Sequence, residues 1–414
     1  RGDAAAAMTQ TISVNTIRPA ASRLIAAVCG AHMMSHYYML MLAPLLAFVR
    51  ADFKVSYTEL ALAVTVFNVV SGLLQTPVGF LVDRIGPRVV LIVGLALSSG
   101  AFAVAGLLDN YWVFVAMYGV AGLGNTVYHP SDYSLLSHHT PAERLSHVFS
   151  FHTFAGMVGS ALAPVTLLYM QSQFGWRGAY IGAAIFGFIV LALLIAQPEP
   201  AADPTHAAKL AARARKNNIV DTGWRLLLTP AILLNLGYFI LTSIMGGGLN
   251  TYLVVALGAL HATTPDVANV ALTSLLAMNA AGVLAGGFLA ARTSHHALVA
   301  ASGLTVAGIV TALVGFFNFP AALLILIMGT SGFCLGITYP SRDMLVRAVA
   351  PPTAYGLVFG FVSTGFNIGA SIAPIVYGML MDRGQPRMVF FLSAAVSILC
   401  VSTVAFGFSK RETR

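Results

Sequence analysis

Apolar residues fall in long blocks along the chain, and short polar stretches, many with glycine or proline, separate the blocks. A block of about 20 apolar residues is long enough to cross about 30 Å of hydrocarbon as an α-helix. A helix also satisfies its own backbone hydrogen bonds, as any segment surrounded by lipid must. The pattern predicts an all-α integral membrane protein with twelve transmembrane helices, near 22–49, 58–82, 89–107, 111–136, 147–170, 177–196, 229–257, 266–290, 297–317, 321–347, 355–380 and 387–408.

The chain also contains an internal repeat, which is the mark of a duplicated unit. A shift of 210 residues places Gly119 on Gly329, Gly122 on Gly332, Pro130 on Pro340 and Ser131 on Ser341. We therefore predict two pseudo-symmetric six-helix bundles, at 22–197 and 229–408, joined by a polar linker at 198–228. Transporters built from such repeats bind their solute between the halves, near the middle of the membrane.

Composition supports a membrane protein and excludes other classes. Only 9% of the 414 residues are charged and 58% are hydrophobic, which leaves too few charges to cover a soluble protein of this size. The formal net charge of +8 comes from basic residues between apolar blocks, so nucleic-acid binding is not expected. Cys29, Cys334 and Cys400 lie in apolar stretches without ligand spacing, so we expect no disulfide framework, metal site or cofactor.

The distribution of lysine and arginine predicts the orientation. Most basic residues lie in the linker, near the termini and in the connections on the same side of the membrane as these. The opposite connections hold only Arg50, Lys54, Arg177, Arg383 and Arg387. Because basic connections stay in the cytoplasm, we expect both termini to be cytoplasmic.

The first residues need a separate interpretation. The string RGDAAAA at 1–7 precedes Met8, and we interpret it as a remnant of cloning. The first apolar block is longer than the core of a signal peptide and has no clear cleavage site, so we expect it to be retained as a helix.

A distinctive string joins the second and third predicted helices. It reads GFLVDRIGPR at 79–88 and resembles the signature loop of the major facilitator superfamily. Shorter strings, LLQTPVG at 73–79, YHP at 128–130 and GMVGSALAP at 156–164, are similar to the fosmidomycin-resistance efflux proteins of that superfamily. The resemblance implies a secondary transporter of the bacterial inner membrane.

The same string is a candidate gating motif, formed by Gly79, Asp83, Arg84, Gly86 and Arg88. Charges at the end of a helix can pair in one state of a transporter and separate in the other, which gives a latch. The second-half copy of the string lacks the acid and keeps a basic residue. The alternative is a loop that stabilises the fold and whose charges only set the topology.

Two pairs of ionisable residues are candidates for proton coupling. His32 and His36 are four residues apart, and His129 and Asp132 are three apart, so each pair shares a helical face. Ionisable groups inside a membrane are costly and usually face the bundle interior, and histidine titrates near neutral pH. Pro130 predicts a kink beside the second pair. The alternatives are histidines that only pack neighbouring helices, and an Asp132 that pairs with Arg144 or Arg84.

Other polar residues are candidates for solute binding. Arg342 occupies the repeat position of Asp132, and a guanidinium in a cavity favours carboxylate, phosphonate or phosphate. The alternative is a local cluster of Arg342 with Asp343 and Arg347. The remaining candidates are intramembrane polar residues that must find partners inside the bundle: His152, Tyr38, Gln75, Asn250 and Asn367.

These features predict a proton-coupled secondary transporter, not an enzyme, that works by alternating access. It is expected to export a small organic anion or drug-like solute, with an uptake symporter for an organic acid as the alternative. Two other classes are a membrane haem or metal enzyme using His32, His36, His129 and His152, and a receptor built on a transporter fold. The expected partners are the solute, protons and the lipid bilayer, and the expected unit is a monomer.

Overall fold

The computed structural model describes residues 19–141, 144–198, 224–350 and 355–408, and every regular element within them is a helix. The first half holds α2 (Pro19–Met39), η1 (Ala43–Leu45), α3 (Leu46–Phe53), α4 (Tyr57–Ile85), α5 (Pro87–Leu107), α6 (Tyr111–Asn125), α7 (Tyr128–His139) and α8 (Leu145–Ala196). The second half holds η2 (Trp224–Leu226), α10 (Pro230–His261), α11 (Pro265–Ala290), α12 (His296–Phe316), α13 (Ala321–Val349), α14 (Tyr355–Asp382) and α15 (Arg387–Phe408). The all-α prediction is confirmed, while the remnant at 1–7 and most of the linker lie outside the described residues.

The helices account for twelve crossings of a membrane. Within the described residues, nine helical segments are long and apolar enough to cross. One of them, α8, has 52 residues and crosses twice, because it contains a bend. The shorter α6 and α7 together make one further crossing, and α15 makes the last.

The first predicted helix is interrupted near its middle. We expected one helix over 22–49, whereas α2 ends at Met39 and the chain continues through η1 into α3. Pro44 explains the break, since its ring has no N–H and clashes with the carbonyl of the residue four positions earlier, Leu40.

The fourth predicted helix is also interrupted. We expected a kink at Pro130, whereas the break lies at Thr126 and Val127, between α6 and α7. Pro130 itself lies in the first turn of α7, where proline is tolerated, and its ring disfavours a helical turn immediately before it. The position of the kink is therefore corrected by one turn.

The fifth and sixth predicted helices run into each other at Gly175. Its φ of 71° and ψ of 172° lie outside the helical region, so the chain turns sharply there. A positive φ of this kind favours glycine, which has no Cβ to clash with the backbone.

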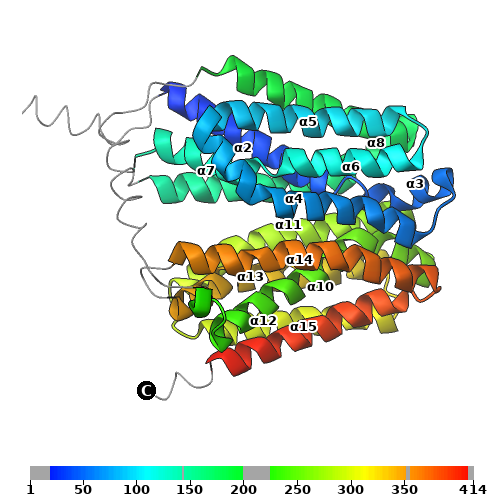
Figure 1. Cartoon of the computed structure of the whole chain (residues 1–414). Coiled ribbons are helices and arrows are strands. Elements are labelled where there is room, and N and C mark those ends of the chain that lie inside the picture. Colours follow the sequence, from blue (N-terminus) through cyan, green and yellow to red (C-terminus); the bar gives the residue numbers. More distant parts are fainter. Residues whose placement is uncertain (1–18, 142–143, 199–223, 351–354, 409–414) are drawn as a thin grey trace, which may run out of the picture.

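The two halves lie side by side with their helices nearly parallel, as Figure 1 shows in blue to green and in green to red. Across the boundary, α4 packs on α14 and α8 packs on α11. Many large apolar side chains are exposed, among them Leu107, Phe174, Phe288 and Leu326, which suits a surface in contact with lipid.

One end of the bundle, which we call the Asp382 end, joins the two halves directly. The carboxylate of Asp382, at the end of α14, accepts hydrogen bonds from the backbone N–H groups of Tyr57 and Thr58, at 2.7 and 2.8 Å. The Thr58 hydroxyl donates to the same carboxylate. These are free N–H groups of the first turn of α4, so the acid of one half caps a helix of the other.

Further hydrogen bonds follow the contact between α4 and α14 toward the middle of the bundle. The hydroxyl of Thr65 donates to the Ser371 carbonyl at 3.1 Å, and the Asn68 amide donates to the Ala370 carbonyl at 3.0 Å. We call the opposite end, where α4 meets α5, the Arg88 end.

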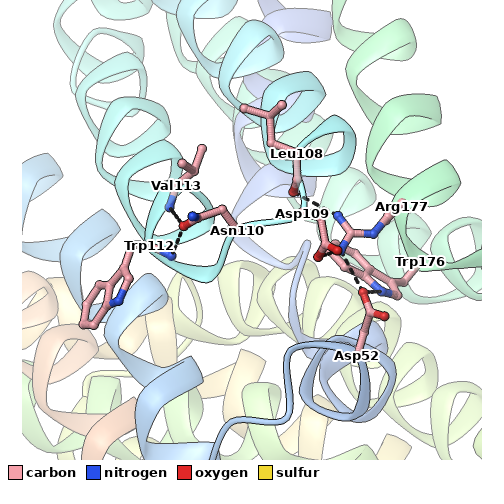
Figure 2. Close-up of polar contacts among 8 residues, drawn as sticks. All are labelled: Asp52, Leu108, Asp109, Asn110, Trp112, Val113, Trp176 and Arg177. Carbon is pink, nitrogen blue, oxygen red and sulfur yellow. Dashed lines mark hydrogen bonds and ion pairs between the residues drawn. The ribbon is translucent and has the colours of Figure 1, made fainter.

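Connections at the Asp382 end are short, and hydrogen bonds hold some of them in place. They comprise 54–56, 108–110, 262–264, 317–320 and 383–386, besides the bend in α8. Figure 2 shows how Arg177 ties three of the first-half segments together. Its guanidinium donates to Asp52 at 2.8 Å, to Asp109 at 2.6 Å and to the carbonyl of Leu108 at 2.9 Å. This clamp fixes α3 to the first half.

Candidate functional site

Three helices of the first half bring five ionisable residues together. His32 and His36 lie on α2, His129 and Asp132 on α7, and His152 on α8. The His32 ring lies 4.8 Å from the His36 ring, 5.7 Å from the His129 ring and 3.7 Å from the His152 ring, between centroids. We call these five residues the histidine cluster. Both pairs that the sequence predicted belong to it, and His152 joins them from a third helix.

Asp132 lies at the centre of the histidine cluster. Its Oδ2 is 2.9 Å from His152 Nε2 and 3.4 Å from His32 Nδ1. The exposed fractions of Asp132, His32 and His152 are 0%, 4% and 1%. The alternative prediction was that Asp132 pairs with Arg144 or Arg84. In the structure Asp132 contacts His152 of α8 instead.

The cluster also contains buried polar atoms that make no hydrogen bond with the described residues. Asp132 Oδ1, His32 Nδ1 and His152 Nδ1 are buried and form no hydrogen bond with the described residues. Unsatisfied buried polar atoms are uncommon in native proteins and need an explanation. These atoms, gathered in one buried cluster of ionisable residues, mark it as a candidate functional site.

Glycine on α8 permits the close packing behind this arrangement. A Cβ atom on Gly156 would lie 2.8 Å from His36 Cδ2 and 2.9 Å from His32 Cδ2. One turn further along, a Cβ on Gly159 would collide with the Met33 carbonyl oxygen. The missing side chains let α8 lie directly against α2 and bring His152 to Asp132.

The cluster contains a set of atoms that a metal could use, but their geometry does not suit one. The candidate donor atoms of His32, Asp132 and His152 lie within 4.8 Å of one another. However, the rings of His32 and His152 are stacked with an angle of 24° between their planes. The nitrogen lone pairs lie in these planes and so do not converge on a point about 2 Å from both, as a bound metal requires.

His36 connects the histidine cluster to a cavity between the two halves. The cavity has a volume of about 300 Å³, and its walls come from both halves. His36, Ser160 and Asn68 line it from the first half, and Asn250 and Tyr339 line it from the second. Ser160 Oγ lies 3.4 Å from His36 Nδ1, so α8 also orients this ring.

The solute-binding candidates lie in different places. Tyr38 and Asn250 line the cavity, whereas Gln75, Asn367 and His152 are not among its described wall residues. Tyr38 is buried at 2% exposure and its hydroxyl is 2.9 Å from Ser99 Oγ, so only part of its ring faces the cavity.

Arg342 lies on α13 one turn beyond Tyr339, which lines the cavity. Its Nε and Nη2 donate to Asp343 Oδ1 at 2.9 and 2.8 Å. Its guanidinium carbon lies 4.6 Å from the Phe239 ring centroid and 5.1 Å from that of Phe366. The local pair with Asp343, predicted as the alternative, forms.

The candidate gating motif joins α4 to α5 at the Arg88 end. Gly86 has a φ of 94°, and Pro87 starts α5, a combination that suits a sharp turn between helices. The Arg88 guanidinium donates to the carbonyls of Leu194, Ile195 and Gln197 at 3.3, 2.9 and 2.7 Å, which fastens the end of α8. Gly79 lies within α4 and Arg84 is exposed, while the side chain of Asp83 lies outside the described residues.

Two like helical bundles with a cavity between them, lined by both, define a polytopic membrane carrier as the class of this protein. The family model of the Major Facilitator Superfamily matches residues 28–263 and 239–414. The chain therefore belongs to the Major Facilitator Superfamily, whose members carry small molecules across membranes and are not enzymes.

Individual relatives cover most of the chain at low identity. A probable sulfoacetate transporter of Cupriavidus necator is 25% identical over 84% of this chain and 84% of its own. A fosmidomycin resistance protein of Escherichia coli is 21% identical over 92% of each chain, as the resemblance predicted. The crystal structure of a bacterial homologue of the human lysosomal transporter Spinster, in an inward-facing and occupied conformation, has a TM-score of 0.81 and 14% identity. The match covers 96% of this chain and 99% of that chain, and it shows the shared fold.

Proposed function

We propose that the protein is a proton-coupled carrier of a small organic anion, with the histidine cluster as its proton site. The observation that carries this proposal is the buried Asp132 carboxylate, in contact with His32 and His152. Ionisable residues in a membrane interior are costly and usually functional. A proton gained or lost here changes the charge of a poorly solvated site. Proton binding can therefore shift the equilibrium between the two conformations of the carrier.

The cavity between the halves is the proposed solute site, with Tyr38 and Asn250 in its walls. Similarity to the probable sulfoacetate transporter of Cupriavidus necator supports an organic anion. Arg342 is a further candidate contact, placed where a solute would pass between the cavity and the Arg88 end. Its guanidinium would exchange Asp343 for a carboxylate of the solute.

Alternating access is the proposed mechanism of movement. The hydrogen bonds that the α4 backbone donates to the Asp382 carboxylate support a state that is closed at the Asp382 end. The positive-inside rule favours an extracellular Asp382 end and cytoplasmic termini, in a bacterial inner membrane. In the opposite state, Asp83 and Arg84 would latch the Arg88 end. One chain contains the cluster and the cavity, which supports a monomer as the working unit.

Export of a drug-like solute is the second candidate, and similarity to the fosmidomycin resistance protein favours it. The sequence resemblance also favours export. Uptake of an organic acid is the alternative direction. The two directions differ in whether the proton and the solute move together or in exchange.

Reconstitution into proteoliposomes tests the proposal. A pH gradient is imposed across vesicles that hold purified protein, and the movement of organic anions and of fosmidomycin is followed in both directions. We expect gradient-driven flux in the unaltered protein. Asp132→Asn removes the titratable carboxylate, so the gradient-driven part of the flux should fall about tenfold or more.

Asp266→Asn is the matched control, since Asp266 is an exposed acid at the Asp382 end of the second half. Arg342→Gln should raise the concentration of anion needed for half-maximal flux while leaving the coupling to protons intact. Flux that ignores the pH gradient in every protein would contradict the proton-coupling proposal.

A further inference from the structure

The cavity has an unusual charge inventory. Of the described residues in its wall, His36 is the one with a basic side chain, and the others are apolar, aromatic, hydroxyl or amide side chains. Arg342 lies one turn away and is already paired with Asp343. A solute in the cavity therefore meets at most one positive charge, and that charge depends on a proton.

The groups behind His36 determine when this proton is held. On α2 the nearest ionisable neighbour is His32, on α7 they are His129 and Asp132, and on α8 it is His152. Ser160 of α8 and the second-half side chains that face His36 across the cavity carry no charge near neutral pH. The neighbourhood thus holds one carboxylate and four imidazoles.

Charge balance limits this neighbourhood to one proton when the cavity is empty. A buried carboxylate with one imidazolium is neutral overall. The imidazole nearest to the Asp132 carboxylate is that of His152, at 2.9 Å. A second proton on any imidazole would leave one uncompensated positive charge in a poorly solvated site, which is costly. That cost disappears only when a negative charge enters the cavity.

We propose that the cavity binds a small monoanionic carboxylate together with one proton, with the proton on His36, so that each solute crosses as a neutral pair. This inference rests on the proposed function, a proton-coupled carrier of an organic anion. The imidazole takes up the proton, the imidazolium N–H then donates to the solute carboxylate, and the net charge of the occupied cavity is zero.

Other features of the cavity agree with such a solute. The Asn250 amide, on the wall of the second half, makes no hydrogen bond with a described residue, so it is free to bind a polar group of the solute. The volume of about 300 Å³ is at the lower end of the range for small-molecule sites. A dianion would bring a second negative charge that the cavity does not balance, so it should be a poorer solute.

The direction of transport follows from the pairing. A proton and an anion that bind together also move together, and an inward proton gradient then drives uptake. Because the pair is neutral, the membrane potential should have no effect on its flux. Both properties separate this mechanism from export in exchange for protons.

The experiment measures solute and proton movement together in proteoliposomes that contain a pH-sensitive dye. Gluconate and glycolate serve as monoanions, and succinate and sulfoacetate serve as dianions. The membrane potential is set independently with potassium and valinomycin. We expect acidification of the lumen with each monoanion, one proton for each solute, and the same rate at every potential.

Variants of His36 test the assignment. His36→Gln keeps a hydrogen-bonding group without a titratable proton, and it should lower monoanion flux about tenfold and abolish the linked acidification. His36→Lys supplies a fixed charge, so anion flux should persist without acidification and become sensitive to the potential. His138→Gln, which replaces an exposed histidine of α7 bonded to the Ser134 carbonyl, should behave as the unaltered protein.

The outcomes separate this inference from the proposed function. Proton-coupled anion flux that survives in His36→Gln, or that changes with the potential in the unaltered protein, overturns the inference and leaves the proposed function standing. Absence of flux for every anion overturns both. Elution of each variant as a single peak in detergent guards against misfolding, and the two His36 variants predict opposite effects on anion flux.

Discussion

The histidine cluster depends on a residue that has no side chain. Gly156 faces His32 and His36 at distances that leave no room for a methyl group. Cores that are already filled tolerate extra atoms badly, at a cost of about 1–3 kcal/mol for a methylene group. The positions of the titratable rings therefore depend on the packing of α8 against α2.

Gly156→Ala should push the rings of His32 and His36 aside. We expect the midpoint of thermal unfolding to fall by a few degrees and the proton-driven flux to fall about tenfold, because contact with Asp132 weakens. Both quantities can be measured on purified protein, by tryptophan fluorescence and in proteoliposomes. Gly100→Ala is the control, since nothing lies within 4 Å of a Cβ at that position in α5. Equal flux in the two variants would contradict the role of Gly156.

At this scale the sequence predicted which residues share a helical face but not which helices meet. The spacing of His32 with His36, and of His129 with Asp132, follows from the helical repeat alone. The contact of Asp132 with His152 depends on how α7 packs on α8, and periodicity within one helix carries no information on that. His152 was therefore predicted as a separate candidate, without its partner.

The contact between helices α4 and α14 holds the two halves together at the Asp382 end, so it must break before the carrier can open there. The Asp382 carboxylate compensates the positive end of the α4 dipole and accepts three hydrogen bonds from Tyr57 and Thr58. Charge-assisted hydrogen bonds of this kind are about twice as strong as neutral ones. All of them must break when the halves separate at that end.

Asp382→Asn should shift the carrier toward opening at the Asp382 end, by about tenfold in the ratio of the two states. Spin labels on Trp112→Cys and Phe317→Cys report this, because both residues are exposed at that end and belong to different halves. We expect a larger fraction of long distances between the two spin labels in Asp382→Asn than in the unaltered protein. Glu59→Gln is the control, since Glu59 accepts from Ser56 N at 2.6 Å and caps α4 within one half. An unchanged distance distribution in Asp382→Asn would contradict the latch.

Among the elements, the apolar pattern predicted the helices well and their interruptions poorly. In the second half the predicted boundaries lie within four residues of the observed ones. The breaks at Leu40 and at Thr126 arise because Pro44 and Pro130 disturb the turn before them. An apolar block that contains such a proline still reads as one crossing, so hydropathy alone does not place the break.

For the whole molecule, the duplication has left different chemistry at equivalent positions. Asp132 and Arg342 correspond in the repeat and both are buried, yet each has its partner within its own half. The repeat could be recognised in the sequence. The pairing of each residue within its own half could not, because it depends on tertiary contacts. Each half can therefore tilt without leaving a buried charge unpaired, which would be costly.

If the two halves move as rigid units, a covalent link between them at the Asp382 end should prevent that end from opening. A disulfide between Thr58→Cys and Asp382→Cys should stop transport while solute still binds from the Arg88 end. Reduction should restore transport, because the contact then opens again. Binding is followed by tryptophan fluorescence. The single Asp382→Cys variant is the control for the loss of the Asp382 carboxylate, and Thr58→Cys is the control for the loss of the Thr58 hydroxyl. Transport that continues in the oxidised double variant would contradict alternating access about this contact.

The short connections at the Asp382 end have a practical consequence for reagents that recognise this protein. No connection there exceeds four residues, and Arg177 holds the neighbouring α3 in place. An antibody fragment that binds this end must contact several turns at once, because no single loop is large enough to form its epitope, and a fragment centred on the boundary contacts turns from both halves. Its affinity would therefore report the separation of the halves, so selection against this face should yield binders that distinguish the two states and hold the carrier in one of them.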